Sequence, residues 1–255
     1  MKEKSGICHL SMIPMRKEPS ERSELVSMLL FGEEYTVKEE QREWIQVITK
    51  FDQYKAWIDK KLFHESEKGE SSRVIDKTIS IQTPWSGNMQ VFPGSELPLV
   101  ALKDKKFRFG SLEYTLNQEI HNPRATKSQR KTIAINAQQY LNSSYLWGGR
   151  IPGSIDCSAL VQIAFKISGI KLPRDSGDQA KKGDLIDLKY GEPGDLAFFE
   201  NQEQKITHVG ILLNNKQILH SSGYVRIDFL DDRGIFDEQK GEYTHRMHSV
   251  RKITE

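Results

Sequence analysis

The sequence predicts an α+β protein with more than one domain, and three features support this prediction. Short segments of β-forming residues recur at intervals of about ten residues through the first half of the chain. An apolar helix follows, in which Leu160, Ile163, Ala164 and Ile167 repeat at helical spacing before Gly169. Strand-like segments fill the rest, and a helical region followed by antiparallel strands is typical of the α+β class.

The composition is that of an ordinary globular protein. The chain has 255 residues, of which 28% are charged and 37% hydrophobic, and its net charge is +2. Positive and negative charges are mixed along the sequence, so we expect neither nucleic acid as a partner nor an acidic tail. No apolar run approaches the ~18 residues needed to span a membrane. Two cysteines do not make a disulfide framework.

The start of the chain bears on where the protein works. Its first residues include lysines but no apolar segment long enough for a signal peptide. We therefore expect a cytoplasmic protein if this is the full chain. If a leader has been removed, we expect an exported protein, in the periplasm or at the cell surface.

The sequence pattern of residues 1–64 predicts a small β-barrel. Turn-forming or charged residues separate the segments, and Arg16 and Pro19 are placed in a loop. Trp44 and Trp57 fit core packing better than ligand contact. The predicted strands are Tyr35–Val37, Trp44–Ile48 and Tyr54–Ile58, with Ile7, Leu10 and Val26 marking earlier ones.

Residues 74–118 predict a second, diverged barrel. A polar linker at 65–73 separates it from the first module, and a further linker occupies 117–127. Its predicted strands are Ile79–Ile81, Met89–Phe92, Leu97–Leu102 and Leu112–Leu116.

Residues 125–255 form the third predicted domain. Ser128 can cap a first helix that presents Ile133, Ala137, Tyr140 and Leu141 on one face. The central apolar helix comes next, and antiparallel strands complete the domain. These strands are Leu196–Phe199, Thr207–Leu213, Gln217–His220, Tyr224–Leu230 and Tyr243–Ile253, with a hairpin turn at Asn214–Lys216.

Cys157 lies at the start of the central helix. Ser154 or Asp156 can cap this helix, so Cys157 falls where backbone N–H groups are unpaired and the helix dipole is positive. That position favours the thiolate, which is the nucleophilic form of cysteine. The alternative is that Cys157 is one more small buried residue, as most free cysteines are.

His208 and His220 lie on the two arms of the predicted hairpin. A loop centred on Asn214 would place them directly opposite each other, whereas an even loop would place them on opposite faces. In the first register one imidazole can take a proton from Cys157 while the other orients it. Two unrelated structural histidines are the alternative. A metal site with Asp156 lacks the close ligand pairs typical of zinc, so we expect no metal and no cofactor.

Several short motifs occur in a fixed order through residues 145–220. They are Tyr145 with Trp147-Gly148-Gly149, Asp156-Cys157-Ser158, Leu172-Pro173-Arg174-Asp175-Ser176 with Gln179, Pro193-Gly194-Asp195-Leu196, His208-Val209-Gly210-Ile211 and His220. In this order the motifs resemble the NlpC-type papain-like cysteine peptidases. This resemblance implies a papain-like catalytic domain, with a central helix against an antiparallel sheet. The first module resembles the bacterial SH3-like domain, so two small SH3-like β-barrels would precede the catalytic domain, as in the γ-D-glutamyl-L-diamino acid endopeptidases.

The resemblance implies a role for each of these positions. Cys157 would be the nucleophile, His208 the general base and His220 the group that orients it. The first module would add Tyr54 and an acidic residue, for which Glu24 fits best by position. The substrate contacts implied in the catalytic domain are Tyr145, Asp156, Ser158, Asp175 and Ser176.

The resemblance also implies a substrate. Members hydrolyse the γ-D-glutamyl to diamino-acid bond of peptidoglycan stem peptides with a free N-terminal L-Ala, in murein peptide recycling or cell-wall turnover. We expect a monomer that binds such a peptide. Two alternatives stay open: a thiol amidase or acyltransferase on another cell-wall amide, and a non-catalytic wall-binding SH3 protein. Ala159 and Ala56 stand where the family commonly has glycine.

Overall fold

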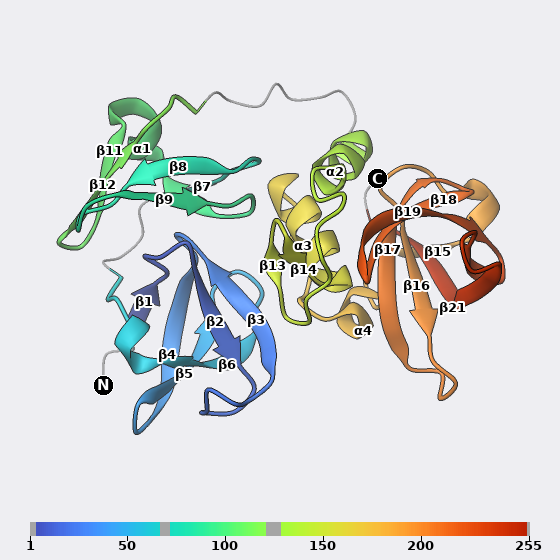
Figure 1. Ribbon diagram of the computed structural model, residues 1–255, viewed down its shortest axis with the longest axis horizontal. Coiled ribbons are helices and arrows are strands. Elements are labelled where there is room, and N and C mark those ends of the chain that lie inside the picture. The colour runs from blue at the N-terminus through green and yellow to red at the C-terminus, as the bar shows by residue number, and fades with distance from the viewer. Residues whose placement is uncertain (1–3, 67–71, 121–128, 254–255) are drawn as a thin grey trace. The chain divides into compact units, whose positions relative to one another are not determined.

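The computed structural model describes residues 4–66, 72–120 and 129–253, and its chain divides into two compact units (Figure 1). These units are Met1–Arg124 and Ala125–Glu255. Most of the regular structure is antiparallel sheet, and the second unit adds the helices α2 Gln129–Gln138 and α3 Cys157–Ile167, so the α+β prediction is confirmed. The predicted boundaries at 1–64, 74–118 and 125–255 stay a prediction, and the two predicted linkers fall partly outside the described residues.

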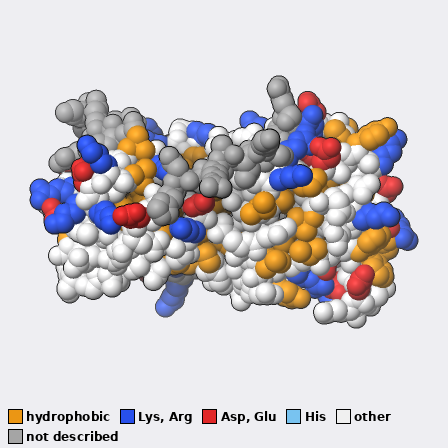
Figure 2. Space-filling model, turned by 90° about the horizontal axis from the view of Figure 1, so that it is seen from above, with side chains coloured by type: hydrophobic (Ala, Val, Ile, Leu, Met, Phe, Trp, Pro, Cys, Tyr) orange, Lys and Arg blue, Asp and Glu red, His pale blue; other side chains and the backbone are white. Residues whose placement is uncertain are grey.

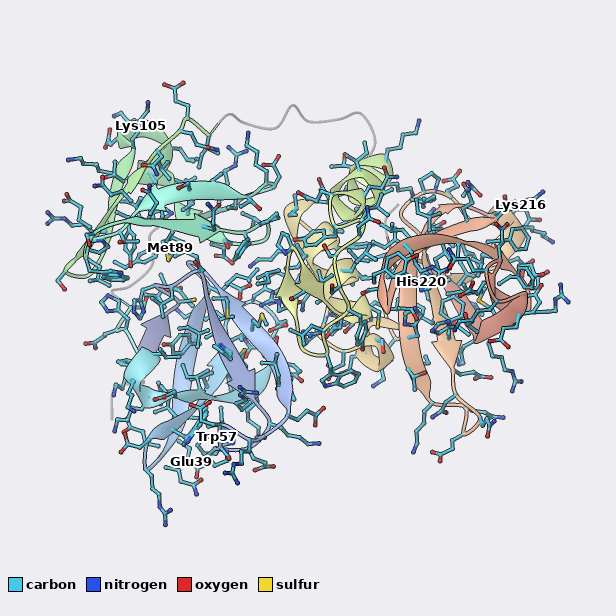
Figure 3. The ribbon with its side chains drawn as sticks, in the orientation of Figure 1. Glu39, Trp57, Met89, Lys105, Lys216 and His220 are labelled. Carbon is cyan, nitrogen blue, oxygen red and sulfur yellow. The ribbon has the colours of Figure 1, made fainter. Side chains whose placement is uncertain are left out.

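The first unit begins with a six-stranded antiparallel sheet in the order β1-β4-β5-β6-β2-β3. Its strands are β1 Ser5–Ile7, β2 Met12–Arg16, β3 Leu25–Leu30, β4 Glu34–Gln41, β5 Trp44–Thr49 and β6 Lys55–Asp59, followed by the short 3-10 helix η1 Lys60–Leu62. In β5, Ile45, Val47 and Thr49 alternate inward and are buried. Trp57 is buried as well (Figure 3). The loop predicted at Arg16 is wrong, because Arg16 ends β2 and pairs with Leu25 and Trp57.

A four-stranded sheet in the order β11-β12-β8-β9 follows, with a separate pair formed by β10 and β7. The strand predicted at Leu97–Leu102 is wrong after Pro98, because Leu99–Asp104 is the helix α1. Proline is well suited to the beginning of a helix, and Leu, Ala and Lys are strong helix formers. The elements are β7 Ser72–Val74, β8 Ile79–Gln82, β9 Asn88–Val91, β10 Glu96–Pro98, α1, β11 Lys106–Phe109 and β12 Leu112–Leu116.

Aromatic rings from both parts of the first unit meet in one of the two core clusters of its described residues. Phe31, which directly follows β3, packs against Phe107, Phe109 and Tyr114 with ring centroids 5.1–6.0 Å apart. All four rings are buried, and Ile7 of β1 belongs to the same cluster. Tilted and edge-to-face rings at such distances pack favourably. The second sheet therefore depends on a side chain that the first one supplies.

The second unit contains a seven-stranded antiparallel sheet in the order β15-β21-β16-β17-β18-β19-β20. The long strand β21 pairs with β16 near one end and with β20 near the other, so β16 to β21 close into a ring. The elements are β13 Arg150–Ile151, β14 Ser154–Ile155, β15 Asp184–Ile186, η2 Leu188–Tyr190, β16 Leu196–Glu200, β17 Ile206–Asn214, β18 Gln217–Ser222, β19 Tyr224–Asp231, β20 Gly234–Asp237 and β21 Glu242–Lys252.

The α-helices in the described part of this unit are α2 Gln129–Gln138, α3 Cys157–Ile167 and α4 Ser176–Gln179. The helix α3 is buried along almost its whole length, and it packs against α2, β17 and β18 (Figure 1). Its start at Cys157 and its apolar spacing are as predicted, and it ends at Ile167, shortly before Gly169. Tyr140 and Leu141 lie beyond the end of α2 rather than on it, and the predicted cap Ser128 lies outside the described residues.

The surface agrees with the mixed charge pattern of the sequence. On the face shown in Figure 2, Lys and Arg side chains lie among Asp and Glu side chains. None of the helices in the described part of the chain is long and apolar enough to cross a membrane.

Candidate active site

Cys157 is the first residue of α3 and only 6% of its surface is exposed. Asp156 is the N-cap, and its Oδ1 accepts from the backbone N–H of Ala159 at 2.8 Å. Its Oδ2 accepts from the N–H of Gly148 at 2.9 Å, which ties the preceding turn to the helix start. Gly149 follows in that turn, and a Cβ there would come within 2.5 Å of the Ser154 carbonyl oxygen. The Gly148-Gly149 pair thus permits the close turn that presents Cys157.

A buried guanidinium completes this support. Arg174 donates to both carboxylate oxygens of Asp156 and, at 2.7 Å, to Ser158 Oγ. The Gln179 side chain donates to the backbone oxygens of Ser158 and Pro173, which fixes α4 against α3. Asp156 and Ser158 are therefore buried parts of the frame around Cys157. Their implied contact with substrate stays a prediction.

The expectation that the helix start favours the thiolate needs correction. Burial, and after it the Asp156 carboxylate, raise the pKa of the Cys157 thiol to about 12. The backbone N–H groups of Val209 and Ser158 and the Arg174 guanidinium oppose this rise without cancelling it. At neutral pH the resting thiol keeps its proton, so attack requires a base that removes it.

His208, the predicted base, lies on β17, and the next residue, Val209, donates its backbone N–H to the Cys157 sulfur. Burial, followed by the neighbouring His220 and His245, holds the pKa of His208 well below its usual value. His208 is therefore a neutral imidazole at neutral pH, and a neutral imidazole can accept a proton.

His208 and His220 share one face of the sheet, although not in the predicted register. The turn Asn215-Lys216 has two residues, and an even loop alone would place them on opposite faces. A β-bulge between Leu212 and Asn214 shifts the pairing by one residue, so His220 faces Gly210. The two rings lie diagonally, with His208 Nε2 and His220 Nδ1 2.9 Å apart.

Gly210 is what allows the two rings to meet. A Cβ at this position would come within 2.9 Å of the His220 Cβ and 2.6 Å of Ile218. Any larger residue would therefore push β18 away from β17. This steric limit explains the glycine two residues after His208.

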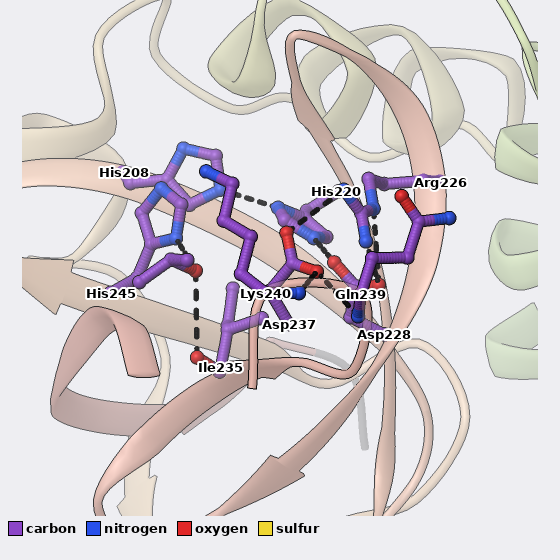
Figure 4. Close-up of polar contacts among 10 residues, drawn as sticks. His208, His220, Arg226, Asp228, Ile235, Asp237, Gln239, Lys240 and His245 are labelled. Carbon is purple, nitrogen blue, oxygen red and sulfur yellow. Dashed lines mark hydrogen bonds and ion pairs between the residues drawn. The ribbon is translucent and has the colours of Figure 1, made fainter. Parts of the chain in front are cut away.

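The hydrogen-bonded chain continues past His220, and sequence reasoning missed this part. His220 Nε2 lies 2.9 Å from Asp228 Oδ2, and Arg226 joins Asp228 to Asp237 (Figure 4). On the other side, His245 of β21 stacks on His208 with ring centroids 4.2 Å apart. One signal was available: Arg226 and Asp228 alternate on the strand after His220, and both point toward the same face as His220.

Tyr145 lies close to Cys157. Burial, followed by the charges of Cys157 and Asp156, raises the pKa of its hydroxyl, which therefore remains a donor. Asp175 and Ser176 lie at the N-terminal end of α4, where Asp175 is exposed and Ser176 half-buried. Tyr145, Asp175 and Ser176 stay predicted substrate contacts.

The two residues predicted from the first unit lie on its barrel. Tyr54 directly precedes β6 and packs partly against the barrel core. Glu24 directly precedes β3, where its carboxylate pairs with Lys17 at 3.1 Å. Their roles stay predictions. Within residues 4–66, 72–120 and 129–253, no three His, Cys, Asp or Glu side chains converge as metal ligands do.

This arrangement can perform acyl transfer. His208 can take the Cys157 proton, and the sulfur can then attack a carbonyl carbon. The N–H groups at the start of α3 can stabilise the oxyanion, and His208 can return the proton to the leaving amine. Water then releases the acyl group from sulfur by the same route.

Two family matches cover most of the site and the first barrel. Residues 142–249 match the NlpC/P60 family, and residues 15–61 match the bacterial dipeptidyl-peptidase SH3 domain. The first range contains Cys157, His208, His220 and Asp228. The second contains Glu24 and Tyr54.

Two curated relatives are similar over both units. The chain is 31% identical, over 76% of its length and 71% of the relative, to a gamma-D-glutamyl-L-lysine dipeptidyl-peptidase of Bacillus subtilis. It is 23% identical, over 86% of its length and 74% of the relative, to a protein of the same name from Bacillus cereus. A crystal structure of an NlpC/P60 family protein from Bacillus cereus superposes with a TM-score of 0.80, at 18% identity over 98% of this chain and 99% of that one. On this similarity, the chain belongs to the NlpC/P60 family of cysteine peptidases.

Proposed function

We propose that this cell-wall peptidase hydrolyses the γ-D-glutamyl to L-diamino acid bond of stem peptides that carry a free N-terminal L-Ala. Cys157 attacks the γ-carbonyl carbon, His208 takes and returns the proton, and His220 orients His208. The products are L-Ala-D-Glu and the peptide that begins with the diamino acid. The protein would act in murein peptide recycling or cell-wall turnover.

One observation supports this substrate above all. The buried Cys157, His208 and His220 occur in a chain that is 31% identical over 76% of its length to a gamma-D-glutamyl-L-lysine dipeptidyl-peptidase. That similarity, with the SH3 match at 15–61, extends beyond the peptidase domain. An enzyme that recognises the free amine of a dipeptide as well as the bond to be cleaved needs a larger binding surface than the catalytic groups alone provide.

The free amine requires an anionic partner. An ammonium that leaves water must be compensated by hydrogen bonds to acceptors, of which a carboxylate is the strongest. Asp175 supports this role because it is exposed at the start of α4, next to the frame around Cys157. Tyr54 and Glu24 of the first barrel stay predicted substrate contacts.

The experiment compares defined tripeptides. L-Ala-γ-D-Glu-L-Lys and L-Ala-γ-D-Glu-meso-diaminopimelate are each incubated with the protein, and products are identified by mass spectrometry. Release of L-Ala-D-Glu by the wild type and none by Cys157→Ala is expected. Release by both proteins would reject Cys157 as nucleophile, and release by neither from either peptide would reject the proposed bond.

The amine preference has its own test. Asp175→Asn should lower kcat/KM about tenfold on the free tripeptide and barely change it on the N-acetylated one, because only the ammonium needs the charge. Asp178→Asn is the matched control, since Asp178 lies on the same helix but pairs with Lys181. If the wild type cleaved the free and the N-acetylated tripeptide at equal rates, amine recognition would be rejected and a general wall hydrolase favoured.

A further inference from the structure

A chain of polar contacts extends from His208 through His220 to Asp228, Arg226 and Asp237 (Figure 4). His208 Nε2 lies 2.9 Å from His220 Nδ1, and His220 Nε2 lies 2.9 Å from Asp228 Oδ2. Arg226 Nε donates to Asp228 Oδ1 at 3.0 Å, and Arg226 Nη1 donates to Asp237 Oδ2 at 3.2 Å. The His220 side chain is 1% exposed and that of Asp228 9%.

Each contact fixes where the next proton lies. An ionised carboxylate only accepts hydrogen bonds, so Asp228 requires the proton of His220 to be on Nε2. When His220 carries only that proton, its Nδ1 is an acceptor, which requires the proton of neutral His208 to be on Nε2. The remaining nitrogen, His208 Nδ1, is left with a lone pair, as a base for the Cys157 thiol must be.

The far end of the chain keeps Asp228 ionised and oriented. Burial opposes its charge, but the hydrogen bond from His220 and the Arg226 guanidinium together hold the pKa of this carboxyl below its usual value. Asp237 in turn holds Arg226, and its Oδ1 accepts from the backbone N–H groups of Gln239 and Lys240. The turn after β20 thus anchors the guanidinium.

We propose that Asp228, held by Arg226 and Asp237, is a positioning residue that sets the tautomer of His208 through His220. It touches neither substrate nor thiol, and it acts only on which imidazole nitrogen carries the proton. This inference rests on His208 being the general base of the proposed function.

Asp228→Asn is the decisive variant. Arg226 can only donate hydrogen bonds, so the amide oxygen of the new asparagine must face Arg226. The amide NH2 must then face His220. His220 Nε2 then becomes an acceptor, and both imidazoles adopt the opposite tautomer. His208 Nδ1 carries a proton and cannot serve as base. We expect kcat to fall about 10³-fold with KM nearly unchanged, as wrong-tautomer variants of hydrolytic triads do.

The direct readout is nitrogen NMR of the ¹⁵N-histidine-labelled protein, which distinguishes protonated from unprotonated ring nitrogens without any substrate. The wild type should show His208 protonated on Nε2, and Asp228→Asn should show it protonated on Nδ1. If the tautomers exchange as expected but no tripeptide is cleaved by the wild type, the proposed function fails while this inference stands. An unchanged His208 tautomer in Asp228→Asn would overturn the inference.

Two further variants separate tautomer control from simple structural support. The double variant Arg226→Met with Asp228→Asn has no guanidinium that donates to the amide oxygen. The amide can then rotate so that its oxygen accepts from His220 Nε2, which restores the original tautomers. We therefore expect kcat to be about tenfold higher than in the single variant Asp228→Asn. Asp231→Asn is the control on the same strand, because Asp231 pairs with Arg233 and Tyr243 instead. A loss in the control equal to that in Asp228→Asn, or no recovery in the double variant, would count against the proposal.

Discussion

The two units of this protein bury different kinds of side chain. The first unit fills one core cluster with rings around Phe31, and its ion pair of Arg108 with Glu113 is exposed. The second unit buries the ion pair of Arg174 with Asp156, whose side chains are 2% and 6% exposed, as well as His208 and His220. Apolar burial stabilises a fold directly, whereas buried charges must be paired to be tolerated at all.

This difference in buried side chains reflects the different requirements of the two units: the first needs only a stable core, whereas the second must also bury reactive groups. A buried thiol and imidazole are useful because low polarity moves their pKa values, and the same low polarity makes any unpaired charge nearby expensive. The second unit therefore surrounds Cys157 with hydrogen-bonded groups. The first unit can use rings, whose packing needs no such pairing.

The two buried cysteines give the largest expected contrast. Cys157→Ala should lower kcat by roughly 10⁴-fold or more, because it removes the nucleophile, with little loss of stability. Cys8 is fully buried in the first barrel, and its thiol donates to the Leu10 carbonyl oxygen at 3.3 Å. Cys8→Ala should leave kcat unchanged and lower the free energy of unfolding by about 1–2 kcal/mol. Tripeptide turnover and chemical denaturation measure the two effects. Loss of turnover in Cys8→Ala, with turnover kept in Cys157→Ala, would contradict the assignment of Cys157 as nucleophile.

The two arginine pairs test the cost of buried charge. Arg174→Ala should lower the free energy of unfolding of its unit by about 3–5 kcal/mol, because Asp156 is left charged and buried without this partner. It should also reduce turnover, since Asp156 caps the helix that begins with Cys157. Arg108→Ala removes an exposed partner of Glu113 and should change neither quantity measurably. Similar losses in both variants would show that burial does not distinguish the pairs.

The smallest effect is a pH dependence that both units share. Burial comes first among the causes that lower the pKa of His9 in the first unit and of His245 in the second, each to about 4. Unfolding restores the ordinary value of 6.5, so between pH 6.5 and 4 the unfolded chain binds more protons and stability falls as pH falls. Above pH 6.5 neither ring contributes.

Replacement of either ring tests this expectation. His245→Phe keeps an aromatic ring beside His208 but cannot bind a proton. The second unit should then lose less free energy of unfolding between pH 7.5 and pH 5, by on the order of 1 kcal/mol, because solvent screening reduces the contribution of the histidine. His9→Phe should do the same for the first unit. Thermal melts at pH 5 and pH 7.5 measure the change, and an unchanged slope in both variants would refute it.

Local sequence predicted much of this architecture because its signals are local. The apolar spacing of α3, its end shortly before Gly169 and the strands on both sides of the Asn215-Lys216 turn all follow from short-range patterns. The helix α1 was missed because Leu97–Leu102 has apolar residues that suit a strand, while Pro98 and its neighbours favour a helix start. A short segment of this kind is decided by what it packs against.

The sequence by itself determined the family, the place of Cys157 at a helix start and the place of the two histidines on one hairpin. Tertiary structure decided three further things: that the Cys157 thiol is buried with a raised pKa, that a bulge near Leu212 brings His208 and His220 to one face, and that Asp228 ends their chain of hydrogen bonds. The physical reason is that burial and strand register depend on residues distant in sequence, and a shift of one residue turns a side chain to the other face.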